Sequence, residues 1–265
     1  MKKAPQSTTT SGYMNHNHGR LYYEVTGSGE PIVFVHGFTL DHRMWAPQVR
    51  EFSGDYQVIT CDLRGFGKSS VPDRPYSHDD DLSALLRHLS VDLARIVGLS
   101  MGGRVAVNFA LSHPSRMRTL AVLDSALDGY PSEVVWDLYS PDSGIAAAKQ
   151  KWIHHQLFNG TRGNAEVMAA LGDMVADYSG WEWTHKDPQT RPAKSARARL
   201  GEISCPTLVV VGEDDLPYFH NMARVIASGI PGAHLETVAG AGHMVNMERP
   251  AECNALLEAH LNTSL

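Results

Sequence analysis

Short apolar runs alternate along most of the chain with segments in which apolar residues recur every three or four positions. The runs are apolar at nearly every position, which is typical of strands buried on both faces of a parallel sheet. They lie at residues 21–25, 31–35, 57–60, 94–97, 119–123, 207–211 and 234–238. Helical spacing occurs in residues 83–89, 103–111, 218–227 and 251–261. Strand followed by helix, repeated in this way, predicts a doubly wound α/β fold with a mostly parallel central sheet and helices on both faces.

The alternation is interrupted between residues 126 and 194, where no β-rich run occurs. Helical spacing is found there instead, at residues 134–136, 146–157 and 165–176. We therefore expect a helical insertion at 126–194 within a core formed by residues 19–125 and 195–265. Residues 1–18 are polar and rich in serine, threonine and asparagine, and we expect them to form a loose N-terminal tail.

A serine stands between a predicted strand and a predicted helix, within the Gly-Leu-Ser-Met-Gly-Gly sequence at residues 98–103. This is the Gly-x-Ser-x-Gly pattern of a nucleophile elbow, in which the serine occupies a tight strand-to-helix turn. Glycines on both sides are needed because Cβ atoms would collide where the backbone folds back. The following helix directs backbone N–H groups and its positive dipole end toward the serine. Ser100 is therefore the candidate nucleophile.

A serine hydroxyl is a weak nucleophile at neutral pH and needs a base that is held in place by an acid. On this kind of fold the acid and then the histidine follow the serine, each in a loop after a later strand. His243 lies in a loop rich in glycine and alanine after the run 234–238, which makes it the candidate base.

Three carboxylates are candidates for the acid. Asp215 is preferred because it has a Gly-x-x-Asp spacing after the run 207–211; its neighbour Asp214 and Asp124, after the run 119–123, are the alternatives. Only one carboxylate is needed to hold the imidazole. We expect the other two to cap loops by accepting hydrogen bonds from N–H groups.

The loop after the run 31–35 begins His36-Gly37-Phe38, at the place where half of an oxyanion hole is expected. The candidate donors are the backbone N–H groups of Phe38 and Met101, since such donors need no particular side chain. His36 is expected mainly to brace this loop and is also a candidate for the pocket wall. Residues 62–69, Asp-Leu-Arg-Gly-Phe-Gly-Lys-Ser, are expected to form a braced turn with a structural role.

Composition excludes several classes of protein. With 265 residues, of which 43% are hydrophobic and 20% charged, the chain is expected to form one large globular domain with an insertion. A net charge of −6 and the lack of long basic runs argue against nucleic acid as a partner. The longest apolar runs have about five to seven residues, whereas a membrane span needs about 20.

Cysteine and histidine positions bear on compartment and metals. Cys61, Cys205 and Cys253 are far apart and have no Cys-x-x-Cys spacing, and the N-terminus has no apolar signal segment, so we expect a cytoplasmic protein. The pairs His16/His18 and His154/His155 do not have the arrangement of a metal site. No metal and no cofactor are expected, because acyl transfer by a serine, a histidine and an acid needs neither.

Together these motifs resemble those of the α/β-hydrolase superfamily, over residues 19–261. The matching positions are His36-Gly37, residues 62–69, the elbow at Ser100, Gly212-x-x-Asp215 and Gly242-His243. Residues 40–48, Leu-Asp-His-Arg-Met-Trp-Ala-Pro-Gln, and the elbow resemble the enol-lactonase-like and carboxylesterase branch. The sequence at residues 36–38 departs from that of enol-lactonases. The resemblance implies an α/β-hydrolase fold in which residues 126–194 form a helical cap over the active site.

The expected cap holds four of the five tryptophans, and they either pack the cap against the core or line an apolar pocket. They are Trp136, Trp152, Trp181 and Trp183. Residues 126–190 contain nine acidic and four basic residues. This charge favours neutral substrates over substrates with a free carboxylate, unless an arginine such as Arg191 or Arg197 reaches the pocket.

Three functions are compatible with these residues. The first is a serine hydrolase acting on a small-molecule carboxylic ester or lactone, with Ser100, His243 and Asp215 as the triad. The second is a hydrolase of C–C bonds in vinylogous diketones, which uses the same triad. The third is a catalytically silent binding protein on the same fold, against which the presence of all three residue types argues.

Overall fold

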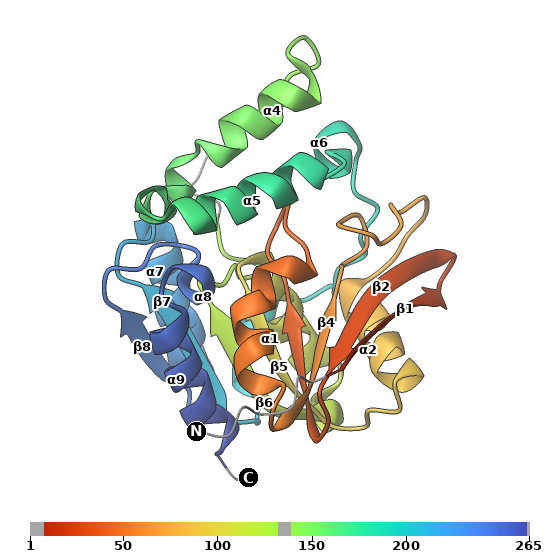
Figure 1. The fold of residues 1–265 in the computed structure, drawn as a ribbon. Helices are drawn as coiled ribbons and strands as arrows, with labels where there is room; N and C mark the ends of the chain where they lie inside the picture. The colour runs from red at the N-terminus through yellow and green to blue at the C-terminus, as the bar shows by residue number, and fades with distance from the viewer. Residues whose placement is uncertain (1–7, 132–138, 264–265) are drawn as a thin grey trace.

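The computed structural model describes residues 8–131 and 139–263, and its central feature is an eight-stranded sheet (Figure 1). The strands are β1 (Thr9–His16), β2 (Gly19–Thr26), β3 (Glu30–Val35), β4 (Tyr56–Cys61), β5 (Ala94–Leu99), β6 (Met117–Leu123), β7 (Thr207–Gly212) and β8 (His234–Val238). Their order across the sheet is β1-β2-β4-β3-β5-β6-β7-β8. The β1–β2 and β2–β4 pairs are antiparallel, and the other neighbouring pairs are parallel. The predicted α/β fold with a mostly parallel sheet is confirmed.

The expectation of a loose tail is wrong for residues 9–16, which form β1. This strand pairs with β2 along its length, from Thr9 opposite Thr26 to His16 opposite Gly19. The two residues between the strands have positive φ angles, 44° and 58°, as tight hairpin turns require. Met14 is the one buried residue of the strand. Because β1 is stabilised by backbone pairing with β2 and not by burial, the hydrophobic pattern does not reveal it. Residues 1–7 of the expected tail lie outside the described ranges.

Helices cover both faces of the sheet. Those of the core are α1 (Ala46–Phe52), α2 (His78–His88), α3 (Met101–Ser112), α7 (Pro217–Gly229), α8 (Val245–Glu248) and α9 (Pro250–Leu261). In Figure 1, α1 and α9 lie side by side in front of the sheet and α2 lies behind it, where it packs against α3. Within the described ranges, no helix has the length and apolar character needed to cross a membrane.

The segment between β6 and β7 lies over the carboxyl ends of the central strands (Figure 1). Its described helices are α4 (Gly144–Ile153), α5 (Ala165–Asp177) and α6 (Trp181–Thr184), with short 3-10 turns at Gln156–Phe158 and Gly160–Gly163. An isolated bridge between Tyr76 and Gln189 connects the end of this segment to the core. The helical spacing noted at residues 134–136 falls outside the described residues. We refer to residues 126–194 below as the inserted segment.

The start of α3 approaches the strands so closely that only glycine fits. A Cβ atom on Gly102 would overlap the carbonyl oxygen of Val35, at the end of β3. A Cβ atom on Gly98, in β5, would in turn overlap the backbone of Gly102. These positions cannot relax by rotating a side chain, because the neighbouring atoms belong to the backbone. The spacing of glycines in the elbow therefore reflects contact between α3, β3 and β5.

We predict that Gly102→Ala lowers the free energy of unfolding by about 3 kcal/mol or more, because the new methyl group must displace backbone atoms. Gly172→Ala is the matched control: Gly172 lies inside α5, and a Cβ atom there would meet nothing within 4 Å. That change is expected to stabilise the protein by about 0.5–1 kcal/mol through helix propensity. Urea denaturation of both variants measures the difference. Equal stabilities would contradict the proposed close contact.

Candidate active site

Ser100 occupies the turn between β5 and α3 in a strained conformation. Its φ and ψ angles are 54° and −114°, a region that residues other than glycine seldom adopt. The backbone is held there because the Ser100 N–H donates to the carbonyl of Leu123 (2.9 Å) and the Ser100 carbonyl accepts from the N–H of Ala126 (3.1 Å). The side chain lies on the wall of a cavity. Strain of this kind persists where the surrounding structure fixes the backbone.

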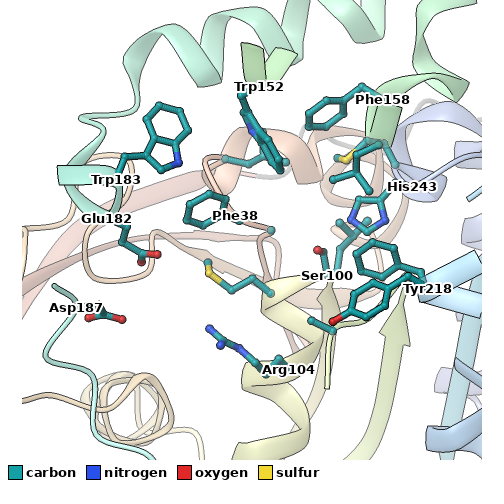
Figure 2. Close-up of a pocket in the computed structure, with 18 of the residues that line it drawn as sticks. Phe38, Ser100, Arg104, Trp152, Phe158, Glu182, Trp183, Asp187, Tyr218 and His243 are labelled. Atoms are coloured by element: carbon teal, nitrogen blue, oxygen red, sulfur yellow. The ribbon is translucent and has the colours of Figure 1, made fainter. Parts of the chain in front are cut away.

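His243 and Asp215 meet inside the protein. Nδ1 of His243 lies 2.9 Å from Oδ2 of Asp215, and the exposed fractions of the two side chains are 2% and 0%. The other oxygen of Asp215 accepts a hydrogen bond of 2.7 Å from the N–H of Leu216. Nε2 of His243 is buried and has no hydrogen-bond partner among the described residues. Figure 2 shows the imidazole on the same side of the cavity as Ser100.

The other two candidate acids do not bind His243. Asp214 is exposed to solvent. Asp124 is fully buried, and its Oδ1 accepts a hydrogen bond of 2.8 Å from the N–H of Gly212. For Asp124 this is the loop-capping role expected of a carboxylate that does not hold the imidazole.

Phe38 and Met101, the expected oxyanion-hole residues, both line the cavity beside Ser100. Met101 is the first residue of α3, so the helix offers its N–H no acceptor. The loop that contains Phe38 is held by Thr39, whose hydroxyl donates to the Phe38 carbonyl (2.6 Å). The same hydroxyl accepts a hydrogen bond of 2.5 Å from the indole N–H of Trp152 in α4. The inserted segment therefore contacts the loop that presents the Phe38 amide.

The cavity has a volume of about 330 Å³, within the range of small-molecule sites. One end, near His243, is largely apolar. It is lined by Trp152, Leu157, Phe158, Tyr218 and Phe219. The other end carries four charged side chains, which are Arg104, Glu182, Asp187 and Arg191. Figure 2 shows Arg104, Glu182 and Asp187 on the side of the cavity opposite Phe158.

A family model for the alpha/beta hydrolase fold matches residues 30–250. The chain belongs to the α/β-hydrolase-fold family. A solved enol-lactonase from Burkholderia xenovorans LB400 is 26% identical, with a TM-score of 0.81, and the match covers 95% of this chain and all of that one. A solved structure titled "Est816 as an N-Acyl homoserine lactone degrading enzyme" is 29% identical, with a TM-score of 0.75 and coverages of 94% and 99%.

A third relative is named as a hydrolase of a different substrate. The 2-hydroxy-6-oxononadienedioate/2-hydroxy-6-oxononatrienedioate hydrolase of Paraburkholderia phymatum is 29% identical over 275 residues, which cover 94% of this chain and 94% of the relative. The resemblance to the α/β-hydrolase superfamily stated from the motifs is confirmed.

The structure of this hydrolase-fold protein brings some of the candidate pocket residues to the cavity wall and places others elsewhere. Trp152 and Trp183 line the cavity, whereas Trp181 stacks on His185, with ring centroids 5.2 Å apart, and is not part of the wall. His36 is also absent from the wall, because it is fully buried beneath the loop. Its Nε2 accepts from the N–H of Leu63 (2.9 Å) and its Nδ1 contacts the carbonyl of Gly37 (2.8 Å). Trp136 lies outside the described residues.

The charged end of the cavity was largely missed by the sequence analysis. Of the two arginines that the sequence offers for the pocket, Arg191 lines the cavity, whereas Arg197 lies over the ring of Tyr130, at 5.5 Å. Arg104 has a signal in the sequence, because it lies one helical turn after Ser100 and therefore on the same face of α3. Glu182 and Asp187 have no such signal, since their position depends on how the inserted segment folds back over α3.

Burial and the negative charge of Asp187 raise the pKa of Glu182 to about 7, although Arg104 and Arg191 act in the opposite direction. Neither arginine binds Glu182 directly. Both instead face Asp128, with N–O distances of 3.7 Å for Arg104 and 3.2 Å for Arg191. This end of the cavity therefore changes its net charge near neutral pH.

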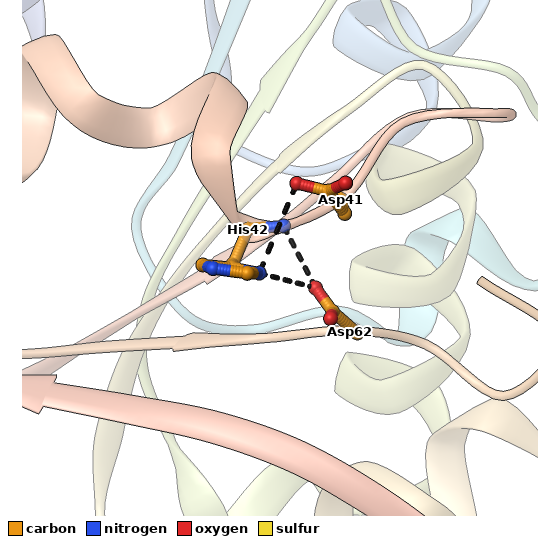
Figure 3. Close-up of side chains that lie close together, drawn as sticks. All are labelled: Asp41, His42 and Asp62. Carbon is orange, nitrogen blue, oxygen red and sulfur yellow. Dashed lines mark hydrogen bonds and ion pairs between the residues drawn. The ribbon is translucent and has the colours of Figure 1, made fainter. Parts of the chain in front are cut away.

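A second buried cluster braces the turn at residues 62–69 (Figure 3). Oδ1 of Asp62 accepts from the backbone N–H of His42 (2.8 Å) and lies 2.7 Å from its Nδ1. Oδ2 of Asp62 accepts from the N–H of Lys68 (2.8 Å). Burial lowers the pKa of His42, but the hydrogen bond and charge of Asp62 outweigh it and raise that pKa above the usual value. The expected structural role of this turn agrees with these contacts.

Two groups of side chains have the spacing of metal ligands in the described part of the chain. They are Asp41, His42 and Asp62, and Asp124, Asp215 and His243, with candidate ligand atoms within 4.8 Å of one another in each group. In both groups backbone N–H donors already bind carboxylate oxygens, at Asp62 and at Asp124. Hydrogen bonding within the protein accounts for both arrangements.

Proposed function

We propose that this protein is a serine hydrolase that cleaves carboxylic esters, including lactones. The observation that carries the proposal is the buried His243–Asp215 pair, which leaves Nε2 of His243 without a partner at the cavity that Ser100 lines. An imidazole held at Nδ1 by a carboxylate and free at Nε2 is the arrangement that a serine nucleophile needs. The strained turn at Ser100 supports the same role, because strain of this kind is concentrated at active sites.

In the proposed mechanism, Oγ of Ser100 attacks the substrate carbonyl carbon while Nε2 of His243 takes the hydroxyl proton. The N–H groups of Phe38 and Met101 bind the oxyanion of the tetrahedral intermediate. The intermediate collapses, the bond to the alcohol oxygen breaks, and His243 returns the proton to that oxygen. Water then attacks the acyl-enzyme with His243 again as base, releasing the acid and restoring Ser100. In a lactone the alcohol and the acid are two ends of one product.

Two relatives favour esters and lactones as the substrate class. The enol-lactonase and the N-acyl homoserine lactone degrading enzyme match nearly the whole chain at 26% and 29% identity. The alternative is hydrolysis of a C–C bond in a vinylogous diketone, which the relative from Paraburkholderia phymatum supports at 29% identity. The same triad serves both reactions, so a substrate comparison decides between them.

We further propose that the inserted segment acts as a cap that shapes the substrate pocket. Trp152, Leu157, Phe158 and Trp183 from this segment line the cavity opposite residues of the core. Their apolar surfaces suit the acyl or alcohol part of a small ester, and the charged end suits a more polar part. All three cysteines are free and buried, which agrees with a cytoplasmic location.

The test is a panel of p-nitrophenyl esters, lactones and a vinylogous diketone, assayed with the wild type and Ser100→Ala. We predict turnover of esters or lactones and a loss of four to six orders of magnitude in kcat for Ser100→Ala, about that of other serine-triad enzymes. A serine-reactive phosphonate should label the wild type at one site and should not label the variant. A folded Ser100→Ala protein with more than a tenth of wild-type turnover would refute the triad. Cleavage of the diketone alone would select the alternative.

A second prediction concerns the acid. Asp215→Asn is expected to lower kcat by about ten-thousand-fold, because an amide stabilises the wrong imidazole tautomer. Asp214→Asn is the matched control, since Asp214 is next to Asp215 in the chain but is exposed to solvent and does not bind His243. We expect its kcat/KM to stay within about twofold of wild type. If both variants are equally active, Asp215 is not the acid.

A third prediction follows from Glu182. As the pH rises through about 7, Glu182 loses its proton and adds a negative charge to the cavity wall. The kcat/KM for an ester with a free carboxylate, divided by that for a matched neutral ester, should therefore fall about threefold to tenfold between pH 6 and 8. The ratio cancels any pH effect on the chemical step, which affects both substrates alike.

Glu182→Gln should make this ratio independent of pH, because the amide does not ionise. Measurements belong at low ionic strength, where repulsion is least screened. A ratio that falls equally in the wild type and in Glu182→Gln would assign the effect to another group.

A further inference from the structure

A second carboxyl group lies beside the His243–Asp215 pair. Asp124 directly follows β6, is fully buried and has a positive φ of 44°. Oxygen atoms of Asp124 and Asp215 and a ring nitrogen of His243 lie within 4.8 Å of one another. Asp124 is not among the described residues that line the cavity. Any part that it plays in the reaction is therefore exerted through its neighbours and not on the substrate.

Asp124 connects the loops that carry Asp215 and His243. Its Oδ1 accepts from the N–H of Gly212 (2.8 Å), the last residue of β7, shortly before Asp215. Its Oδ2 accepts a longer hydrogen bond, 3.4 Å, from the N–H of Val245, shortly after His243. One side chain thereby fixes the start of the Asp215 loop relative to the end of the His243 loop.

The proximity of the two carboxyl groups, within 4.8 Å, favours a proton on one of them. Two adjacent buried carboxylates repel each other, so one of them stays protonated at neutral pH. Burial and the charge of Asp215 raise the pKa of Asp124 well above its usual value; the N–H groups of Gly212 and Val245 lower it, and a hydrogen bond to the Asp215 side chain raises it further. Asp215 already accepts hydrogen bonds at both oxygens, from Leu216 and at His243, which suits the ionised member of the pair.

The other groups that face Asp124 do not supply a compensating charge. Cys253, on α9, is a fully buried thiol whose pKa is raised by burial, so it stays neutral. Glu248, on α8, binds the N–H groups of Gly242 and Met244 and not Asp124. No lysine or arginine pairs with Asp124 among the described residues. The charge balance of this region therefore depends on Asp124, Asp215 and His243.

We propose that Asp124 is a positioning residue: a neutral carboxylic acid that donates a hydrogen bond to Asp215 and holds that carboxylate against Nδ1 of His243. The proposal rests on the function proposed above for Ser100, His243 and Asp215. A neutral donor fixes the orientation of Asp215 without adding a second negative charge. A second charge at this place would stabilise the imidazolium relative to the free base that the reaction needs.

The matched variants are Asp124→Asn and Asp124→Ala. An asparagine amide has the shape of a protonated acid, with an N–H to donate to Asp215 and an oxygen to accept from Gly212, and asparagine tolerates positive φ. It gives up only the long hydrogen bond from Val245, because the amide nitrogen does not accept. Asp124→Asn should therefore keep kcat within about threefold of wild type and leave the pH profile unchanged. Asp124→Ala removes the donor, and we expect kcat to fall about tenfold to a hundredfold with KM nearly unchanged.

The acid limb of kcat/KM should also move to higher pH in Asp124→Ala, by about half a unit to one unit. The reason is that Asp215, without its donor, interacts more strongly with the imidazolium and stabilises it relative to the free base. All rates are divided by the concentration of active sites titrated with the phosphonate, so a loss of folded protein does not lower the measured kcat. If Asp124→Ala has the kcat per active site and the pH profile of the wild type, Asp124 has only a structural role. Asp124→Asn as impaired as Asp215→Asn would show that Asp124 acts as a charged carboxylate. Either result overturns the proposal.

An independent measurement does not require activity. The measurement uses Ser100→Ala protein, with Asp124 either kept or changed to Asn. A carboxyl group that is protonated in the folded state but ionised in the unfolded state stabilises the fold fully at pH values below its unfolded pKa, about 4. That stability is lost as the pH rises toward the folded pKa. Asparagine has no such dependence, so the folding equilibrium constant of Asp124→Asn relative to Asp124 should rise by up to tenfold per pH unit between pH 4 and 7.

Urea denaturation at several pH values measures this ratio. A ratio that does not change with pH would mean that Asp124 is ionised in the folded protein and would overturn the proposal. If Ser100→Ala protein is active and the ratio rises, the proposed function is overturned, and the positioning role of Asp124 with it. The conclusion that Asp124 is protonated in the folded protein would still hold.

Discussion

The contact between the start of α3 and the backbones of β3 and β5 is the constraint on which the candidate active site depends. It is possible only because Gly98 and Gly102 have no Cβ atoms. The close approach forces Ser100 into a strained conformation and places it at the cavity. The same approach puts the first N–H of α3, that of Met101, beside the loop of Phe38. The proposed nucleophile and the two proposed backbone donors are thus positioned by one packing contact, before any side chain of the inserted segment takes part.

The inserted segment contributes more than a cover. Trp152 binds Thr39, which in turn binds the Phe38 carbonyl, so the segment helps to fix the backbone of that loop. The ring of Phe38 also contacts the rings of Trp152 and Trp183, with centroids 5.8 and 6.4 Å apart. Substrate shape and the geometry of the proposed oxyanion hole are therefore coupled through a small aromatic cluster. A change in the segment that alters specificity is expected to alter this loop as well.

Electrostatics divide the site into two regions that respond differently to pH. Around Asp124, Asp215 and His243 the side chains are buried and fixed by backbone N–H groups, so protonation there is governed by desolvation and by the repulsion between neighbouring carboxyls. At the far end of the cavity, Glu182 and Asp187 face two arginines that pair with Asp128. The excess of acidic residues in residues 126–190 does not give the net charge of this end of the cavity. The two arginines that line it come from α3 and from just beyond residue 190.

The sequence by itself determined the order of strands and helices, the elbow at Ser100 and the loops of Asp215 and His243, because each is encoded by neighbouring residues with a distinct local pattern. It did not reveal β1, whose stability comes from pairing with β2. It also offered His36 and Trp181 as candidates for the cavity wall, where the structure has neither. The charged end of the cavity and the proximity of Asp124 to Asp215 bring together segments that are far apart in the chain. Only the tertiary structure decides these features, since distance between remote residues and loss of solvent on burial determine which groups meet and which keep a proton.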